Sequence, residues 1–192
     1  DNLTVRKHEI VAVVGVAGNG QNELAERVRA SVKNIAFIPE DRTRNAIISR
    51  MTIAENISLG ASHWKRGQAI RTATDLIAQY GIRAEGPLQL AGELSGGNQQ
   101  KVVLARELHR KPGLIVASEP TRGLDLDATA FVHSQLADAV AAGAGALLIT
   151  SDLDEAFALA HGIHVIYRGA LSERMTADVA RTRVAGLMAG VT

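Results

Sequence analysis

Short apolar runs alternate with amphipathic stretches along most of the chain. The apolar runs predict buried strands at residues 9–14, 34–38, 114–117, 146–150 and 163–167. Apolar residues at helical spacing, such as Leu24 and Val28, predict helices between and after these strands. Strands and helices in alternation favour an α/β fold in which helices cover both faces of a mostly parallel sheet.

Polar residues mark several of the predicted helix starts. Thr52 and Glu55 have the spacing of a capping box, and Asp127 and Asp152 are each placed to cap a helix. From about residue 45 to 93 the pattern contains helices and no convincing strand. We therefore predict an α/β core of residues 1–48 and 94–192, interrupted by a helical insertion of residues 49–93.

The composition is that of an ordinary globular domain, because 46% of the 192 residues are hydrophobic and 21% are charged. The formal net charge of +1, without a run of Lys or Arg, gives no reason to expect broad nucleic-acid binding. The absence of cysteine fits a cytosolic protein. The most apolar region, residues 140–149, is too short to span a bilayer, so we expect any link to a membrane to be made through a partner.

A glycine-rich loop, residues 15–22, lies between the first predicted strand and the following helix. Its frame, Gly-x-x-x-x-Gly, is that of a phosphate-binding P-loop in the appropriate context. The dinucleotide fingerprint fits less well, because Glu23 stands where its third glycine would be. The alternative is a strand-to-helix turn that is merely rich in glycine.

A second candidate for phosphate binding is the segment Leu-Ser-Gly-Gly-Asn-Gln-Gln-Lys at residues 94–101. It leads into a helix that carries Val103, Leu104 and Leu108 on one face. The start of such a helix offers free backbone N–H groups and the positive end of the helix dipole to an anion. The alternative is an ordinary helix capped by its serine.

Residues 94–101, followed by Val-Val-Leu-Ala-Arg, resemble the signature element of ATP-binding-cassette (ABC) ATPases. Other segments resemble further motifs of that family in the same order along the chain: the Q-loop at 39–42, the Walker B segment at 114–121, the D-loop at 123–125 and the switch segment at 149–153. The resemblance implies a P-loop NTPase core with a mostly parallel sheet and a helical subdomain. The family's antiparallel β subdomain would be truncated or missing, since only residues 27–33 separate the first helix from the next strand.

The wording of three motifs, Pro-Glu-Asp-Arg, Ser-Gly-Gly-Asn-Gln-Gln-Lys and Glu-Pro-Thr-Arg-Gly-Leu-Asp, narrows the resemblance. They look like the second, C-terminal half of the tandem ATP-binding proteins of bacterial sugar and nucleoside importers. This resemblance implies ATP and Mg²⁺ as cofactors, a second cassette in a head-to-tail dimer, and transmembrane permease subunits as partners. It also implies a cytoplasmic location, peripheral to the membrane.

Several residues that hold phosphate and metal in this family are replaced here. The P-loop lysine and Ser/Thr correspond to Gln21 and Asn22, and the Walker B carboxylate corresponds to Ser118. Without the lysine and that carboxylate, we expect nucleotide binding to be ~10²–10⁴-fold weaker. The switch histidine corresponds to Ser151, and the Q-loop glutamine corresponds to Glu40.

Glu119 stands at the position of the general base, although we expect it to have little to act on without an organised γ-phosphate. The alternative is that this acid caps or pairs locally. The degenerate P-loop would present to nucleotide the residues Gly15, Gly18, Asn19, Gly20, Gln21 and Asn22. The signature element and D-loop would present to the nucleotide of a partner cassette the residues Ser95, Gly96, Gly97, Asn98, Gln99 and Asp125.

We therefore interpret the chain as a degenerate nucleotide-binding domain, inactive or very weak alone, that completes the ATP site of a partner cassette. Two alternatives stay open: a self-sufficient ABC-type ATPase with unusual phosphate and metal ligands, and a non-transport ABC module. No separate metal site is predicted, because His161 and His164 have no carboxylate or cysteine partner at ligand spacing. The sequence does not identify the transported solute. It also leaves open whether a cassette precedes this chain and why the segment near residues 30–33 is short.

Overall fold

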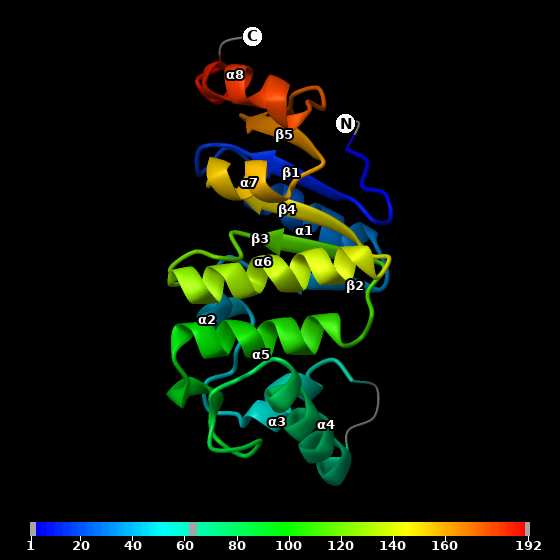
Figure 1. The fold of residues 1–192 in the computed structure, drawn as a ribbon, viewed down its shortest axis with the longest axis vertical. Coiled ribbons are helices and arrows are strands. Elements are labelled where there is room, and N and C mark those ends of the chain that lie inside the picture. The colour runs from blue at the N-terminus through cyan, green and yellow to red at the C-terminus, as the bar shows by residue number, and fades with distance from the viewer. Residues whose placement is uncertain (1–2, 62–64, 191–192) are drawn as a thin grey trace. The chain divides into compact units, whose positions relative to one another are not determined.

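The computed structural model describes residues 3–61 and 65–190. Figure 1 shows these residues as a ribbon. In chain order the elements are β1 (Ile10–Val14), α1 (Gln21–Ser31), β2 (Ile35–Ile38), α2 (Arg42–Asn45), α3 (Ile53–Ser58), α4 (Arg66–Gln79), the 3₁₀ helix η1 (Ala91–Glu93), α5 (Gly96–Leu108), β3 (Leu114–Ser118), α6 (Leu126–Ala141), β4 (Gly145–Thr150), α7 (Leu153–Leu159), β5 (Gly162–Tyr167), β6 (Ala170–Leu171) and α8 (Ala177–Met188).

The chain divides into two compact units. The first contains the residues up to Phe37, residues 112–120 and the residues from His133 onward. The second contains Ile38–Lys111 and Thr121–Val132, so that helix α6 begins in the second unit and ends in the first.

The first unit is built on a sheet with the strand order β2-β3-β4-β1-β5-β6. Strand β4 pairs in parallel with β3 and β1, β1 pairs in parallel with β5, and β6 returns antiparallel to β5. The five predicted strands are confirmed, with ends that shift by one residue at most. The short β6 was not predicted, because two residues after a turn carry no readable alternation.

Apolar side chains explain why the central strands lie inside this unit. Every residue of β1 and β4 is buried, as expected for parallel strands that are covered on both faces. In Figure 1, helix α7 lies in front of the sheet and α1 behind it. One core cluster joins the sheet to α1, and its buried members are Val13, Leu24, Ala25, Val116, Leu147, Ile149 and Ile166.

The parallel register places the carboxyl ends of three neighbouring strands at one edge of the sheet. Val14 at the end of β1 is opposite Thr150 at the end of β4, and Ser118 at the end of β3 is opposite Ile149. The segments that follow these strands therefore leave the sheet side by side. Ligands of open α/β sheets bind outside the carboxyl ends of the strands.

The second unit is helical. Helix α3 packs against α4 and α5, and α2 contacts α5. Its buried apolar residues include Ile53, Ile57 and Ala73, and the amide of the buried Asn56 bonds to the backbone of Ile48 through both its oxygen and its nitrogen. Because α3 also packs on α5, this unit is larger than the segment 49–93, whose role as an insertion stays a prediction.

Two of the three predicted helix caps are confirmed. Thr52 and Glu55 form both hydrogen bonds of a capping box at the start of α3, and Asp152 accepts bonds from two backbone N–H groups at the start of α7. The prediction that Asp127 caps a helix is wrong. Helix α6 begins at Leu126, and the cap is Asp125, whose Oδ1 accepts a bond of 2.8 Å from the N–H of Ala128. The helix thus starts earlier than the apolar pattern alone indicates.

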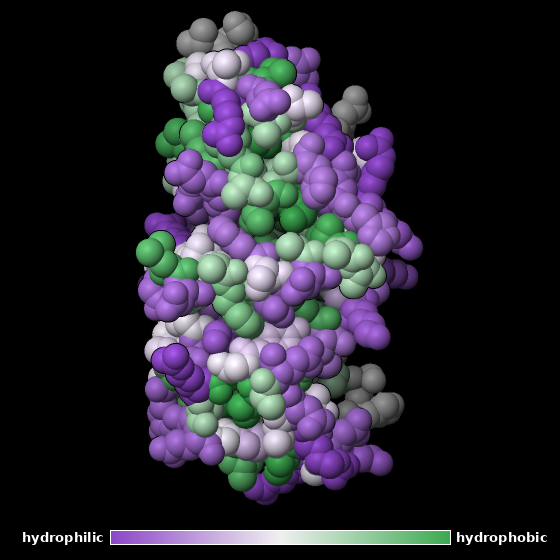
Figure 2. Space-filling model, in the orientation of Figure 1, coloured by the Kyte–Doolittle hydropathy of each residue, from purple (hydrophilic) through white to green (hydrophobic). Residues whose placement is uncertain are grey.

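Hydrophobic residues lie among hydrophilic ones over the face shown in Figure 2. Within the described ranges, none of the helices combines the length and the apolar character needed to cross a membrane.

Glu9, just before β1, supplies a test of stability against pH. Burial acts to raise the pKa of its carboxyl, but hydrogen bonds from the Arg174 guanidinium and from the N–H of Arg6 outweigh burial, and the pKa is lowered from 4.5. A carboxyl with a lowered pKa stabilises the fold above its unfolded value, and this contribution is lost as the pH falls through the folded value. We expect Glu9→Gln to lower the free energy of unfolding by about 1 kcal/mol at pH 7.

The measurement is urea unfolding of both proteins at several pH values. The difference between them should shrink steadily below pH 4.5. A difference that stays constant down to the lowest pH would contradict an ionised Glu9 as the source of the stability.

Candidate functional site

The P-loop segment, residues 15–22, follows β1 directly and enters α1 at Gln21. Gly18 and Gly20 have φ values of 86° and 106°, a left-handed conformation that favours glycine. At Gly15, an added Cβ would lie 2.6 Å from the carbonyl oxygen of Ile166 in β5. The loop therefore has the backbone conformation and the close approach to the sheet that only glycine permits.

The side chain of Gln21 folds back into this loop. Its Oε1 accepts a hydrogen bond of 2.9 Å from the N–H of Asn19, and its Nε2 donates one of 2.8 Å to the carbonyl of Val16. In a working P-loop the backbone N–H groups of this segment hold phosphate oxygens. An amide oxygen of the protein itself thus occupies one of the donors that a phosphate would use.

The loop is also tied to the turn between β5 and β6. The side-chain oxygen of Asn19 accepts a bond of 2.9 Å from the N–H of Arg168, and its carbonyl accepts one of 2.8 Å from the N–H of Gly169. Asn22, by contrast, is exposed on α1. Sequence reasoning did not find the connection to residues 168 and 169, since nothing in the pattern places this turn beside the loop.

Glu119 and Ser151 lie together at the carboxyl ends of β3 and β4. The Oε1 of Glu119 accepts a bond of 2.7 Å from the N–H of Ser151, and the N–H of Glu119 donates one of 2.7 Å to the carbonyl of Ile149. Glu119 has a φ of 45°, which is unusual for a residue with a side chain, while Ser118 is buried. The positions predicted for the general base and the switch are therefore neighbours, and the carboxylate is engaged by backbone.

Glu40, at the Q-loop position, belongs to the second unit and forms an ion pair with Arg122. Arg42 donates a hydrogen bond of 3.3 Å from Nη1 to the carbonyl of Arg122. The charge of Glu40 is thus offset by an arginine of the same unit rather than left facing a phosphate.

The signature element, also in the second unit, leaves its helix start open. Ser95 is the N-cap residue of α5, yet its hydroxyl caps none of the backbone N–H groups. Instead, its Oγ accepts a bond of 2.9 Å from the side chain of Asn98, whose Oδ1 is held by the N–H of Arg83. Among described residues the first backbone bond of the helix comes from Gln99 to the Ser95 carbonyl, so the N–H groups of Gly96, Gly97 and Asn98 have no partner.

This geometry disfavours the alternative of a serine-capped helix and adds a residue that sequence reasoning missed. A Cβ on Gly96 would lie 2.5 Å from Nη2 of Arg42, so the guanidinium rests against the start of α5. A cation here adds to the attraction that the open N–H groups and the helix dipole exert on an anion. The only available signal was the charged segment after β2, and no spacing rule connects that segment to residue 96.

Other contacts hold α5 in its place. Lys101 donates a bond of 2.9 Å to the carbonyl of Gly81 and lies 4.6 Å from the ring centre of Phe131. The amide of the buried Gln99 donates to the carbonyl of Ala91. Asp125 caps α6, and the position of a Cβ on Gly97 is 3.3 Å from the Cβ of Ala128 in that helix. The predicted residues 95–99 and 125 are thus fixed within one unit.

The described part of the chain contains no group of three or more His, Asp or Glu side chains able to hold a metal ion.

Comparison with known proteins identifies the class to which these elements belong. The family model described as "ABC transporter" matches residues 21–122, a stretch that covers more than half of the chain. The chain belongs to the ABC transporter family.

Two curated relatives illustrate the match. The guanosine import ATP-binding protein NupO of Bacillus subtilis is 33% identical over 225 residues, covering 100% of this chain and 44% of that protein. The ribose import ATP-binding protein RbsA 2 of Mesorhizobium japonicum is 33% identical, covering 94% of this chain and 41% of that protein. The chain thus spans less than half the length of these relatives.

Solved structures confirm the predicted fold class. A dimeric ATP-binding cassette in a post-hydrolysis state, bound to ADP and Pi, superposes with a TM-score of 0.76 at 19% identity, over 92% of this chain and 88% of that chain. The ATP-binding subunit of an ABC transporter gives 0.72 at 20% identity, over 99% and 87%. The fold is the α/β fold of ABC ATPases with a mostly parallel sheet.

Proposed function

We propose that the chain is a degenerate nucleotide-binding domain of an ATP-driven importer of the sugar or nucleoside class, in the C-terminal position of a tandem protein. Its signature element would complete the ATP site of a partner cassette in a head-to-tail dimer. The names of the relatives support the importer class, since they include guanosine and ribose import proteins. Their length supports a tandem arrangement, because this chain matches 44% and 41% of them.

The observation that carries the proposal is the contrast between the two phosphate-facing elements. In the P-loop, the amide of Gln21 occupies the N–H of Asn19 and brings no charge. The first three backbone N–H groups of α1 and of α5 are alike unpaired in the described chain, but only at the signature element does a cation, Arg42, stand beside them. The start of α5, where this cation adds to the open N–H groups, is therefore the element that we assign to the nucleotide of a neighbouring cassette. ATP and Mg²⁺ would be bound mainly by that neighbour.

The second unit also offers a surface for the permease partner. A cleft of about 340 Å³ is lined by residues 44–48 and by parts of α5. The buried Arg106 holds this segment by donating a bond of 2.7 Å to the carbonyl of Ala46. Residues 40–45 connect the Q-loop to this cleft. The motion of the two cassettes toward each other would therefore be transmitted to the permease here. The domain would then sit at the cytoplasmic side of the membrane without entering it.

The proposal is tested by calorimetry and ATPase assays on the 192-residue chain. We expect no micromolar binding of Mg-ATP and no hydrolysis above background, because the lysine and the metal-holding carboxylate are replaced. Glu119, which keeps the acidic character of the base position, favours a second candidate, a self-sufficient ATPase. Micromolar binding of ATP that requires Mg²⁺, together with ATP hydrolysis that Ser118→Ala abolishes, would establish the self-sufficient ATPase and contradict the proposal.

A further inference from the structure

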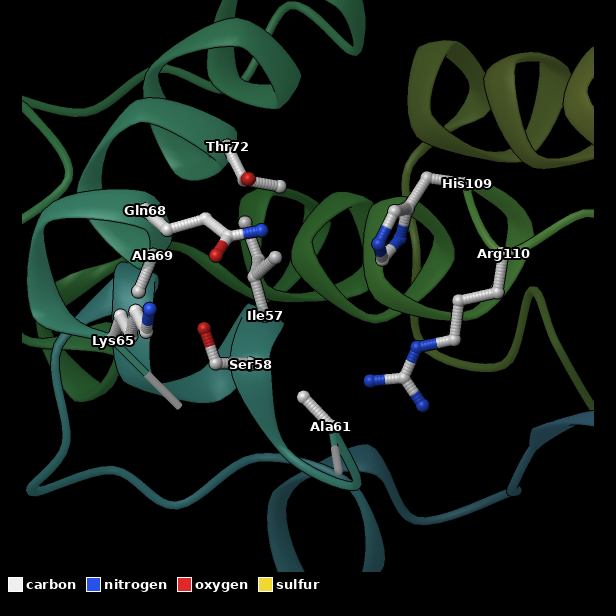
Figure 3. A pocket seen from close by; sticks show the side chains of 9 residues that line it. All are labelled: Ile57, Ser58, Ala61, Lys65, Gln68, Ala69, Thr72, His109 and Arg110. Carbon is white, nitrogen blue, oxygen red and sulfur yellow. The ribbon is translucent and has the colours of Figure 1, made fainter. Parts of the chain in front are cut away.

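A cavity of about 140 Å³ lies in the second unit, away from the residues of the signature element. It is formed by the end of α3, the start of α4 and the end of α5 (Figure 3). Figure 3 shows the side chains of Gln68, His109 and Arg110 directed toward the same space. The apolar side chains of Ile57 and Ala69 form part of its lining.

The lining is positively charged. Lys65 and Arg110 both border the cavity, no lining residue is a carboxylate, and neither cation forms an ion pair with a described residue. Lys65 is the N-cap residue of α4 and its side chain makes no capping hydrogen bond, so the positive end of a helix of 14 residues lies beside the lysine. The charges at this cavity are thus uncompensated within the described part of the chain.

Several polar groups in the lining have unused bonding capacity. Lys65, Gln68 and Thr72 follow each other at helical spacing along α4, and none of their side chains bonds to a described residue. Arg110 donates from Nη2 to the carbonyl of Leu59, which fixes its guanidinium and leaves further N–H donors. His109 is held by a contact of 2.8 Å between its Nδ1 and the carbonyl of Ala105. The cavity therefore collects ammonium, guanidinium, amide and hydroxyl donors.

We propose that this cavity binds a phosphate group. Charge-assisted hydrogen bonds from Arg and Lys to an oxyanion are the strongest that these side chains form. The size excludes a nucleotide or a sugar phosphate held whole, since pockets for such ligands measure roughly 300–1,000 Å³. The occupant is therefore a single tetrahedral oxyanion, either free inorganic phosphate or the phosphate of a lipid headgroup whose remainder stays outside. The inference does not depend on the proposed function.

The experiment titrates the full 192-residue chain with inorganic phosphate at constant ionic strength and follows amide resonances by NMR. We expect saturable shifts in α4 and at the end of α5, with a dissociation constant raised about tenfold by Lys65→Gln and by Arg110→Gln. Arg71→Gln removes the same charge from an exposed site on α4 outside the cavity and should leave the affinity unchanged. Because Arg110 also bonds to Leu59, Lys65→Gln gives an independent reading if Arg110→Gln perturbs the fold.

A second arm distinguishes the two sources of phosphate. Flotation with phosphatidylcholine vesicles, with and without phosphatidylglycerol, should show binding that Lys65→Gln weakens and Arg71→Gln does not if the ligand is a headgroup. Phosphate binding without such flotation assigns the site to free phosphate. Shifts that do not saturate, or that Lys65→Gln and Arg71→Gln weaken equally, would overturn the proposal, because they report general surface charge.

Discussion

Replacing Ser95 with arginine should abolish transport-coupled ATP hydrolysis in the proposed importer while leaving the chain folded. Ser95 is exposed, and its hydroxyl accepts one hydrogen bond, from Asn98, so the isolated domain loses little. In the proposed dimer this position meets the γ-phosphate of the neighbouring cassette, where only small residues allow close approach. An arginine would hold the two cassettes apart and remove the geometry on which phosphoryl transfer depends.

The measurement compares ATPase rate and solute uptake in membranes or vesicles with the thermal unfolding of the purified chain. Thr74→Arg is the matched control, since it places the same side chain on an exposed position of α4. The control should retain activity, and both variants should unfold within a few degrees of the parent. Normal hydrolysis by the Ser95 variant would show that residues 94–101 do not serve a partner's nucleotide.

Changing Gln21 to lysine should tighten Mg-ATP binding to the isolated chain by about 10–100-fold, which corresponds to one charged hydrogen bond. The substitution removes the amide oxygen that occupies the N–H of Asn19 and supplies the cation that P-loops place on the β- and γ-phosphates. Hydrolysis should stay near background, because Ser118 and Ser151 are unchanged.

Calorimetry of the parent, Gln21→Lys and Gln21→Ala separates the two effects. The alanine variant frees the N–H without adding charge and should show a smaller gain than the lysine variant. Equal affinities for all three proteins would mean that the loop does not receive the phosphates of a nucleotide at all.

The apolar pattern predicted the strands well because a parallel sheet covered on both faces needs runs such as Ile10–Val14 and Gly145–Thr150. The sequence named Glu119 and Ser151 only as separate motif positions, and they meet because neighbouring parallel strands bring their carboxyl ends together. Local capping at Thr52 and Asp152 was also readable, because donor and acceptor are three residues apart or fewer.

The remaining features depend on contacts that sequence spacing does not encode. Arg42 reaches the start of α5 from the first residue of α2, more than fifty residues earlier, and the cavity beside α4 collects residues from three parts of the helical unit. The side chain of Gln21 turns back into its own loop because its rotamer is held by two hydrogen bonds, to the N–H of Asn19 and to the carbonyl of Val16. Asp125 rather than Asp127 caps α6. Both acids lie close to the helix start, and the sequence pattern does not show at which of them the helical backbone begins.

The replaced residues are spread over separate strand ends: Gln21 and Asn22 follow β1, Ser118 ends β3 and Ser151 follows β4. A mutation that reverts one of them would leave the others unable to organise metal or γ-phosphate, so selection for hydrolysis would have nothing to favour at any single step. Under the proposed function, the loss of catalysis in this domain would not be reversed by single mutations. Lineages that carry this domain would be committed to an asymmetric pair of cassettes, in which the exposed Asn22 tolerates substitution while Gly15, Gly18 and Gly20 stay constrained by the backbone.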